Sequence, residues 1–163
     1  MEWLGTLFLF LHVGGSIVAF GPTFAFPFMG ARAAKEPMHG NFALRINHLL
    51  VERVVEPGAA FVFLMGVGLI VTRGWNPFTE LWLGVGILLF LLIFFYNLLV
   101  QLPRTKRMIE ITSGPPPAPP EGGGPPAGPP PEFLELAGKS ARGGMLSTLG
   151  LFIILFLMVF KPL

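Results

Sequence analysis

Long apolar runs alternate with shorter polar stretches along the whole chain, and this pattern predicts four membrane-spanning helices. The predicted spans cover approximately residues 3–28, 41–72, 79–102 and 144–160. A helix needs about 17 to 25 residues to cross a hydrocarbon layer that is about 30 Å thick. Because consecutive spans cross in opposite directions, the sequence predicts one all-α membrane domain over residues 1–163, a polytopic protein built as an antiparallel bundle of four transmembrane helices.

The second span differs from the others because its first half carries a polar stripe. Five side chains recur at helical spacing on one face: Arg45, His48, Glu52, Arg53 and Glu56. The uncharged stretch from Pro57 to Thr72 has 16 residues, or about 24 Å of helix, which is shorter than the hydrocarbon. Residues 41–56 therefore either continue the span or form a separate helix on the membrane surface. Apolar Val54 and Val55 favour one helix that runs through Pro57 with a kink.

A low-complexity segment separates the third and fourth spans. Between Gly114 and Pro131 the chain contains ten Pro and five Gly. Such a segment buries no apolar core, so residues 114–131 are predicted to be a disordered or polyproline-II linker. It serves either as a spacer or as a ligand for a proline-recognition domain.

The positions of the basic residues predict the orientation in the membrane. Two of the connections between spans hold nine of the eleven Lys and Arg residues: Arg32, Lys35, Arg45, Arg53, Arg104, Lys106, Arg107, Lys139 and Arg142. Positive residues favour the cytoplasmic side, so the chain is predicted to lie in the cytoplasmic membrane of a cell with both termini outside. Trp3, Trp75 and Trp82 then form an aromatic belt at the outer interface. Topology accounts for the basic residues, so no nucleic-acid partner is predicted.

Composition limits the chemistry that the chain can perform. Hydrophobic residues make up 53% of the chain and charged residues 12%, about half the charged fraction of a soluble domain. The absence of cysteine excludes disulfides, thiol catalysis and Cys-ligated iron–sulfur clusters. No phosphate-binding loop, nucleophile triad or HExxH motif occurs, so no catalytic residue is predicted. The sequence favours a non-enzymatic accessory or scaffold component in the lipid bilayer, as a homo-oligomer or as a subunit of a membrane complex.

His12 is the candidate for binding a cofactor. It shares one face of the first span with small or weakly polar residues: Gly15, Ser16, Ala19 and Thr23. Such a face lets a neighbouring helix or a flat cofactor approach. His12 therefore either binds haem b or copper, or makes an interhelical hydrogen bond to a backbone carbonyl, to Ser147 or to Thr148.

The ridge of His48, Glu52 and Glu56 is the candidate metal site, because the three residues follow each other at i, i+4 and i+8. The alternatives are ion pairs with Arg45 and Arg53, or an ion or proton pathway along Glu52 and Glu56. His12 lies about 13 Å and His48 about 36 Å below the outer boundary at 1.5 Å per residue, so one haem iron cannot bind both. Glu56 lies about 24 Å deep by the same count. At that depth it needs a partner from another helix: a lysine or arginine of the connection between the third and fourth spans, Asn97 or Gln101.

Three stretches carry a resemblance to known families. They are FLHVGGS, EPGAAFVFLMGVGLIVTRG and QLPRTKRM, at residues 10–16, 56–74 and 101–108. With them the chain resembles a family of predicted bacterial four-helix integral membrane proteins of unknown function. More distantly, it is similar to the membrane parts of copper-resistance protein D and of HemJ-type protoporphyrinogen oxidase. The resemblance implies a fold and a membrane location, and no established activity.

Overall fold

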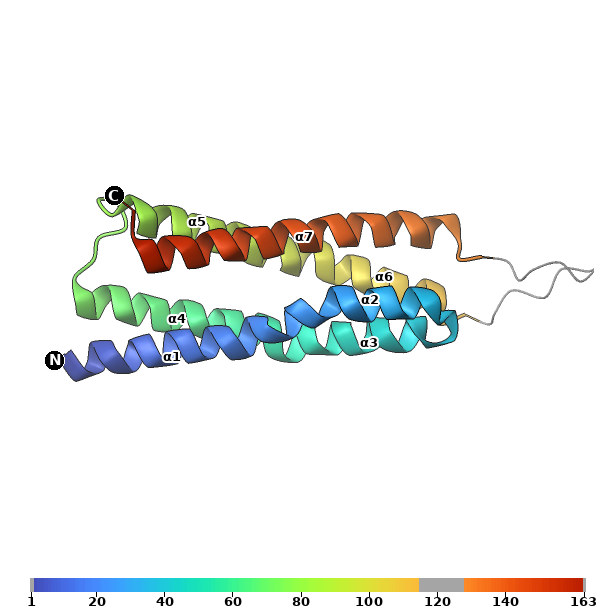
Figure 1. The fold of residues 1–163 in the computed structure, drawn as a ribbon, viewed down its shortest axis with the longest axis horizontal. Helices are drawn as coiled ribbons and strands as arrows, with labels where there is room; N and C mark the ends of the chain where they lie inside the picture. The colour runs from blue at the N-terminus through green and yellow to red at the C-terminus, as the bar shows by residue number, and fades with distance from the viewer. Residues whose placement is uncertain (1, 115–127, 163) are drawn as a thin grey trace, which may run out of the picture.

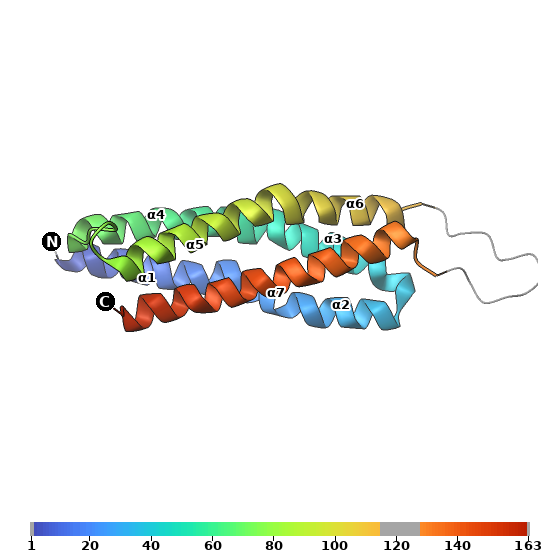
Figure 2. The ribbon, with the colours of Figure 1, turned by 90° about the horizontal axis from the view of Figure 1, so that it is seen from above.

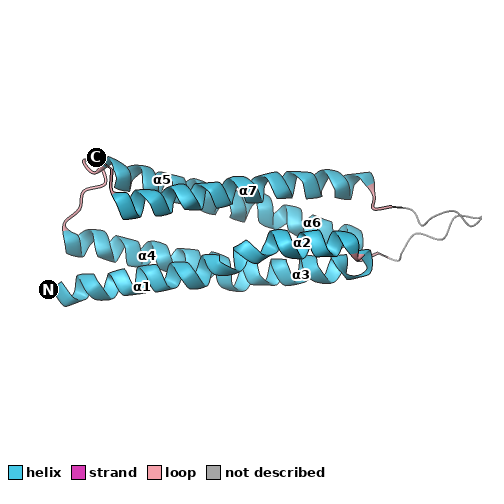
Figure 3. Ribbon diagram, viewed as in Figure 1, coloured by secondary structure: helices cyan, strands magenta, loops and turns pink. Residues whose placement is uncertain are grey.

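The chain forms four long helical segments that lie side by side in an elongated bundle (Figure 1). A computed structural model of the protein describes residues 2–114 and 128–162. The four segments are Glu2–Lys35, Gly40–Arg73, Leu81–Thr112 and Pro131–Phe160. Every regular element in the described residues is helical (Figure 3). Each segment is long and apolar enough to cross a membrane, so the prediction of an all-α bundle of four transmembrane helices is confirmed.

The first segment changes helix type at a proline. It consists of α1 (Glu2–Phe20), a 3₁₀ turn η1 (Gly21–Ala25) and α2 (Phe26–Lys35). Pro22 lies at the start of η1, where its missing N–H leaves no hydrogen bond unmade within the first turn. A short 3₁₀ turn, η2 (Pro37–His39), then reverses the chain.

The second segment passes through Pro57 without ending. It consists of α3 (Gly40–Leu50), a π-helical turn η3 (Val51–Val55) and α4 (Glu56–Arg73). The proline ring crowds the carbonyl four residues earlier and offers no N–H. The preceding turn widens to i→i+5 hydrogen bonds, and the Glu56 N–H donates to the Val51 carbonyl. One helix running through Pro57 was the favoured interpretation of the sequence, and the structure agrees with it.

The third segment repeats this arrangement and the fourth is an uninterrupted helix. The third consists of α5 (Leu81–Tyr96), a π-helical turn η4 (Asn97–Gln101) and α6 (Leu102–Thr112). Pro103 follows η4, and the Leu102 N–H donates to the Asn97 carbonyl. The fourth segment is α7 (Pro131–Phe160).

The helix irregularities lie at a common level of the bundle. Glu56 is 17 residues from Arg73, and Asn97 is 16 residues from Leu81. At 1.5 Å per residue both positions lie about 24–26 Å from the end where α1 begins and α7 ends (Figure 2). We call this end the termini end. The η1 turn begins 19 residues from Glu2, or about 29 Å along.

The helices are longer than a hydrocarbon layer. The first two segments have 34 residues each, or about 51 Å, which exceeds a 30 Å layer by about 20 Å. The added length comprises α2, α3, α6 and the first half of α7, which lie away from the termini end (Figures 1 and 2). Three helical segments are therefore longer than the predicted spans. The first continues to Lys35, the third continues to Thr112, and the fourth already begins at Pro131. Most of the predicted 114–131 linker, residues 115–127, lies outside the described residues.

Two antiparallel hairpins form the half of the bundle near the termini. α1 packs against α4, and α5 packs against α7. The first contact is close: a Cβ added at Gly58 would lie 2.7 Å from the Ala19 Cβ. Aromatic rings connect the hairpins, with Phe63 stacked on Phe90 at 5.6 Å between centroids. The buried apolar side chains are Ala19, Ala59, Val62, Leu69, Trp82, Leu83 and Met108.

Candidate functional site

The side chain of His12 lies in the contact between α1 and α4. Its Nδ1 atom is 2.9 Å from the Val62 carbonyl oxygen. Because a carbonyl oxygen only accepts, Nδ1 carries the proton in this hydrogen bond. The imidazole ring rests on Gly66, where an added Cβ would come within 3.1 Å of the ring. The structure therefore realises the interhelical hydrogen bond to a backbone carbonyl, one of the two roles that the sequence left open.

The small face around His12 is filled by α4. An added Cβ at Gly15 would lie 3.1 Å from the Phe61 ring, and Ala19 lies against Gly58. A haem on this face would have to separate α1 from α4, so the residues present do not fit a flat cofactor there. Of the hydroxyls considered as partners, Thr148 donates to the Gly144 carbonyl at 2.9 Å.

The ridge of His48, Glu52 and Glu56 is only partly assembled. His48 Nε2 is 4.0 Å from a Glu52 carboxylate oxygen, and the His48 side chain is 15% exposed against 47% for Glu52. Across residues 2–114 and 128–162, no group of three or more His, Asp or Glu side chains is placed to hold a metal ion. A metal at these three residues stays a prediction, and the geometry gives it no support.

Buried polar atoms lie without hydrogen-bond partners in the same stretch. In the described residues they are Asn47 Oδ1, His48 Nδ1 and Glu56 Oε2. The two amides that the sequence suggested as partners for Glu56 are engaged elsewhere, because Asn97 and Gln101 bind α7. A buried polar atom without a partner costs about 1–3 kcal/mol, so this stretch is the least satisfied part of the described interior.

A polar contact between η4 and α7 went unrecognised in the sequence. The Asn97 side-chain amide donates to Ser147 Oγ at 3.2 Å, and the Gln101 amide donates to the Ser140 carbonyl at 3.0 Å. Arg104 donates to Gln101 Oε1 at 2.9 Å. Gly143 is buried beside Gln101. The i, i+4 spacing of Asn97 and Gln101 could have indicated a polar face on this helix. It could not have identified their partners, because those lie on α7, 50 and 39 residues away in the sequence.

A second polar contact joins α3 to α6. The Asn41 side-chain amide donates to Thr112 Oγ1 at 2.7 Å and to the Ile109 carbonyl at 3.2 Å. Arg45 donates to Ser113 Oγ at 3.0 Å. Arg45 thus contacts α6 rather than the carboxylates of its own helix, which removes one of the ion pairs considered for Glu52 and Glu56.

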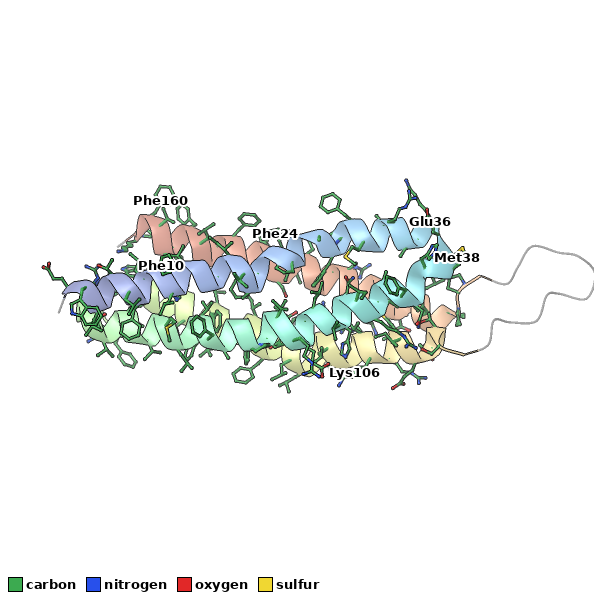
Figure 4. The ribbon with its side chains drawn as sticks, turned by 90° about the horizontal axis from the view of Figure 1, so that it is seen from below. Phe10, Phe24, Glu36, Met38, Lys106 and Phe160 are labelled. Carbon is green, nitrogen blue, oxygen red and sulfur yellow. The ribbon has the colours of Figure 1, made fainter. Side chains whose placement is uncertain are left out.

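Among the hollows on the surface of the described residues are two shallow grooves. One, of about 420 Å³, lies between α1 and α4 and is almost entirely apolar. The other, of about 350 Å³, lies between α2 and α3, and we call it the α2–α3 groove. Its lining residues are Phe28, Met29, Arg32, Ala33, Glu36, His39, Phe42 and Ala43. Figure 4 places Glu36 and Met38 at the end of the bundle opposite to Phe10 and Phe160.

Large apolar side chains around the α2–α3 groove are strongly exposed. The exposed fraction is 78% for Phe28, 85% for Met38 and 66% for Phe42. Phe42 is 31 residues from Arg73, or about 46 Å along the helix, well beyond a 30 Å layer that starts at the termini end. Glu36 forms ion pairs with Arg32 and with His39, the latter at 3.4 Å.

An aromatic cluster fixes the C-terminal end of α7. The Lys161 ammonium lies 4.4 Å from the Trp75 ring centroid and 5.5 Å from that of Trp82. Trp82 is buried and donates its indole N–H to Glu80 at 3.0 Å. Trp3 on α1 lies at the same end of the bundle. The three tryptophans thus share one end of the bundle, with Trp82 buried there, and an aromatic belt at the outer interface stays a prediction.

Comparison with known proteins places these features in one family. A family model described as "Predicted integral membrane protein (DUF2269)" matches residues 6–162, which include nearly all of the four segments. A search of curated proteins and a search of solved structures each returned no match. Four apolar helices and this match show an integral membrane protein that sits in a lipid bilayer. The chain belongs to the DUF2269 family of predicted integral membrane proteins.

Proposed function

We propose that this protein is a non-enzymatic accessory component of the cytoplasmic membrane that holds a partner protein at the α2–α3 groove. One observation carries the proposal, the exposed apolar surface of Phe28, Met38 and Phe42. Exposed apolar patches outside the hydrocarbon mark protein contacts, because water does not solvate them favourably. The groove also presents Arg32 and Glu36, which give a polar rim to an apolar centre, the usual anatomy of an interface.

The distribution of basic residues supports a cytoplasmic position for the groove. Nine of eleven Lys and Arg residues belong to the connections on the groove side, and such residues favour the cytoplasm. Both termini then lie outside. The partner in this proposal is a cytoplasmic protein or the cytoplasmic part of another membrane subunit.

Site-specific photo-crosslinking in intact membranes tests the proposal. A photoreactive amino acid at Phe42 is compared with one at Leu134, which is 58% exposed on α7 and also lies beyond the hydrocarbon. The expected result is a discrete protein adduct from position 42 that is absent from position 134. Adding Phe28→Asp should abolish that adduct and leave the fold intact, because the Phe28 side chain is largely exposed. Adducts with lipid alone, or identical adducts from both positions, would contradict a docking role.

A second candidate function is an ion or proton pathway along Glu52 and Glu56. The buried Glu56 Oε2 atom without a hydrogen-bond partner favours it, because buried carboxylates in membrane helices often serve transport. Glu52 is about half exposed one turn away, so the two carboxylates connect the surface to the interior. The flux of ions or protons into liposomes that contain the purified protein should then be lower for the Glu56→Gln variant than for the parent. Equal flux in the parent and the variant would remove this candidate.

A further inference from the structure

On the third and fourth segments, a run of exposed large apolar side chains extends from the termini end to a similar level. The run ends at Val100 on the third segment and at Met145 on the fourth, and Leu134 is exposed farther along the fourth. A continuous apolar surface of a membrane protein faces the acyl chains, so the end of this run marks the edge of the hydrocarbon, with Leu134 and the α2–α3 groove beyond it. Lys106 and Arg142 lie just past it and are exposed.

Arg53 on the second segment is also exposed, close to this level. Arg53 is 20 residues from Arg73, Lys106 is 25 residues from Leu81, and Arg142 is 18 residues from Phe160. At 1.5 Å per residue these distances from the termini end are about 30, 38 and 27 Å. Figure 4 shows Lys106 between Phe24 and Glu36 along the bundle axis. Long Lys and Arg side chains bridge a spread of this size by extending toward the interface.

Among the described residues, Arg53, Lys106 and Arg142 have no acidic partner. Arg45 and Arg104 also lack one but donate to Ser113 and Gln101. Lys35 is exposed at 33 residues from Glu2, or about 50 Å, and so lies well past this level. On the same half of the bundle Arg32 pairs with Glu36, Arg107 with Glu132 and Lys139 with Glu135. Within residues 2–114 and 128–162, Arg53, Lys106 and Arg142 take part in none of the side-chain hydrogen bonds or ion pairs. Three unneutralised cations on three segments therefore face the layer where lipid phosphates lie.

We propose that Arg53, Lys106 and Arg142 form a basic girdle that binds the phosphate groups of anionic phospholipids. Each basic residue near an anionic membrane surface strengthens attraction by about fivefold, so the three together contribute on the order of 100-fold. Arginine adds directed hydrogen bonds to phosphate oxygens, and lysine adds a point charge. The girdle anchors the bundle at one depth and leaves the polar half, with the α2–α3 groove, outside the hydrocarbon.

Lipid binding to the purified full-length chain in a neutral detergent tests the girdle. Short-chain phosphatidylglycerol is titrated against phosphatidylcholine, and the triple variant Arg53→Gln, Lys106→Gln, Arg142→Gln is compared with the parent. The expected result is tighter binding of phosphatidylglycerol by the parent and a loss on the order of 100-fold in the variant. Raising the salt concentration should weaken the parent's preference, because exposed charges are screened.

A matched control removes three charges that already have partners: Arg32→Gln, Arg107→Gln and Lys139→Gln. This control should keep the preference for phosphatidylglycerol. Equal loss in both triple variants would overturn the proposal, because net charge alone would then explain binding. Competition by inorganic phosphate at the lipid concentration would also overturn it, in favour of a free-anion site. If the triple variant fails to fold, Arg53→Gln alone should still lose about fivefold.

Discussion

The contact between α1 and α4 makes a quantitative prediction about Gly58. A methyl group added there would lie 2.7 Å from the Ala19 Cβ and 3.2 Å from the Ala19 Cα. Favourable carbon–carbon contacts lie at about 3.5–4.0 Å, so Gly58→Ala forces the helices about 1 Å apart or bends one of them. The helices cannot simply rotate, because His12 rests on Gly66 and Gly15 rests on Phe61 farther along the same contact, toward the termini end.

The cost of Gly58→Ala follows from overpacking a close contact. Extra carbon in a well-packed interior costs about 1–3 kcal/mol. Separation of α1 from α4 would also lengthen the 2.9 Å hydrogen bond between His12 Nδ1 and the Val62 carbonyl. Ala favours the helix more than Gly does, so the same substitution also stabilises the helix by up to about 1 kcal/mol. Subtracting about 1 kcal/mol of helix propensity leaves a net destabilisation of about 0–2 kcal/mol against the parent, and of about 1–3 kcal/mol against another Gly→Ala variant that gains the same propensity.

Thermal unfolding of the purified protein in detergent measures this effect. Gly14→Ala is the matched control on the same hairpin, because nothing lies within 4 Å of the added Cβ, and it should leave the Tm unchanged or raised. The double variant Gly58→Ala, Ala19→Gly removes the closest atom and should recover part of the loss. If Gly58→Ala unfolds at the temperature of Gly14→Ala, the close contact between α1 and α4 is refuted.

Four further predictions concern topology, the polar contacts and cofactors. Single cysteines at Asn76 and Gly123 should label from opposite sides of the membrane; labelling of both from outside would refute the four-span topology. Gln101→Leu should lower stability by about 1–3 kcal/mol in thermal unfolding, because it removes the donor to the Ser140 carbonyl and the acceptor for Arg104. The Glu56→Gln variant should have the Tm of the parent if the role of Glu56 is structural. A loss of ion or proton flux with an unchanged Tm would indicate a transport role. Purified protein titrated with haem should show no His12-dependent absorption band, and a band lost in His12→Ala would refute the packing role.

The sequence predicted the four apolar helices because hydropathy and helix length can be read directly from the residues. It missed the helical extensions because those stretches are amphipathic rather than apolar. In α7 the apolar residues Phe133, Leu134, Leu136 and Ala137 recur at helical spacing before the predicted span, and this signal was available. Proline-rich sequence immediately upstream masked it.

Proline chemistry adds a detail that the sequence did not predict. A kink at Pro57 was predicted, and the structure shows that the turn before this proline widens to a π-helix. The same π-helical turn precedes Pro103 in the third segment. Sequence patterns identify where proline interrupts the hydrogen bonds, but not how the preceding turn makes up for the lost bond.

The candidate site was harder to predict than the fold because its contacts join distant residues. The sequence placed His12 on a small face, but the choice between a cofactor and a carbonyl depended on Gly66 being 54 positions away on α4. For Glu56 the sequence predicted the need for a partner but not its identity. The suggested amides of Asn97 and Gln101 bind α7 instead.

The two halves of the bundle differ in how far close packing holds them together, and this difference bears on how the protein works. Near the termini, small residues bring helices close, as at Gly58 on Ala19 and at Gly150, where an added Cβ would lie 2.5 Å from Ile93. In lipid there is no hydrophobic drive between helices, so close packing supplies the association, together with the hydrogen bond between His12 and the Val62 carbonyl. In the other half, side-chain hydrogen bonds join α3 to α6 and η4 to α7. Water competes for such bonds, so this half is the more readily rearranged by a bound partner, and it is the half that carries the α2–α3 groove.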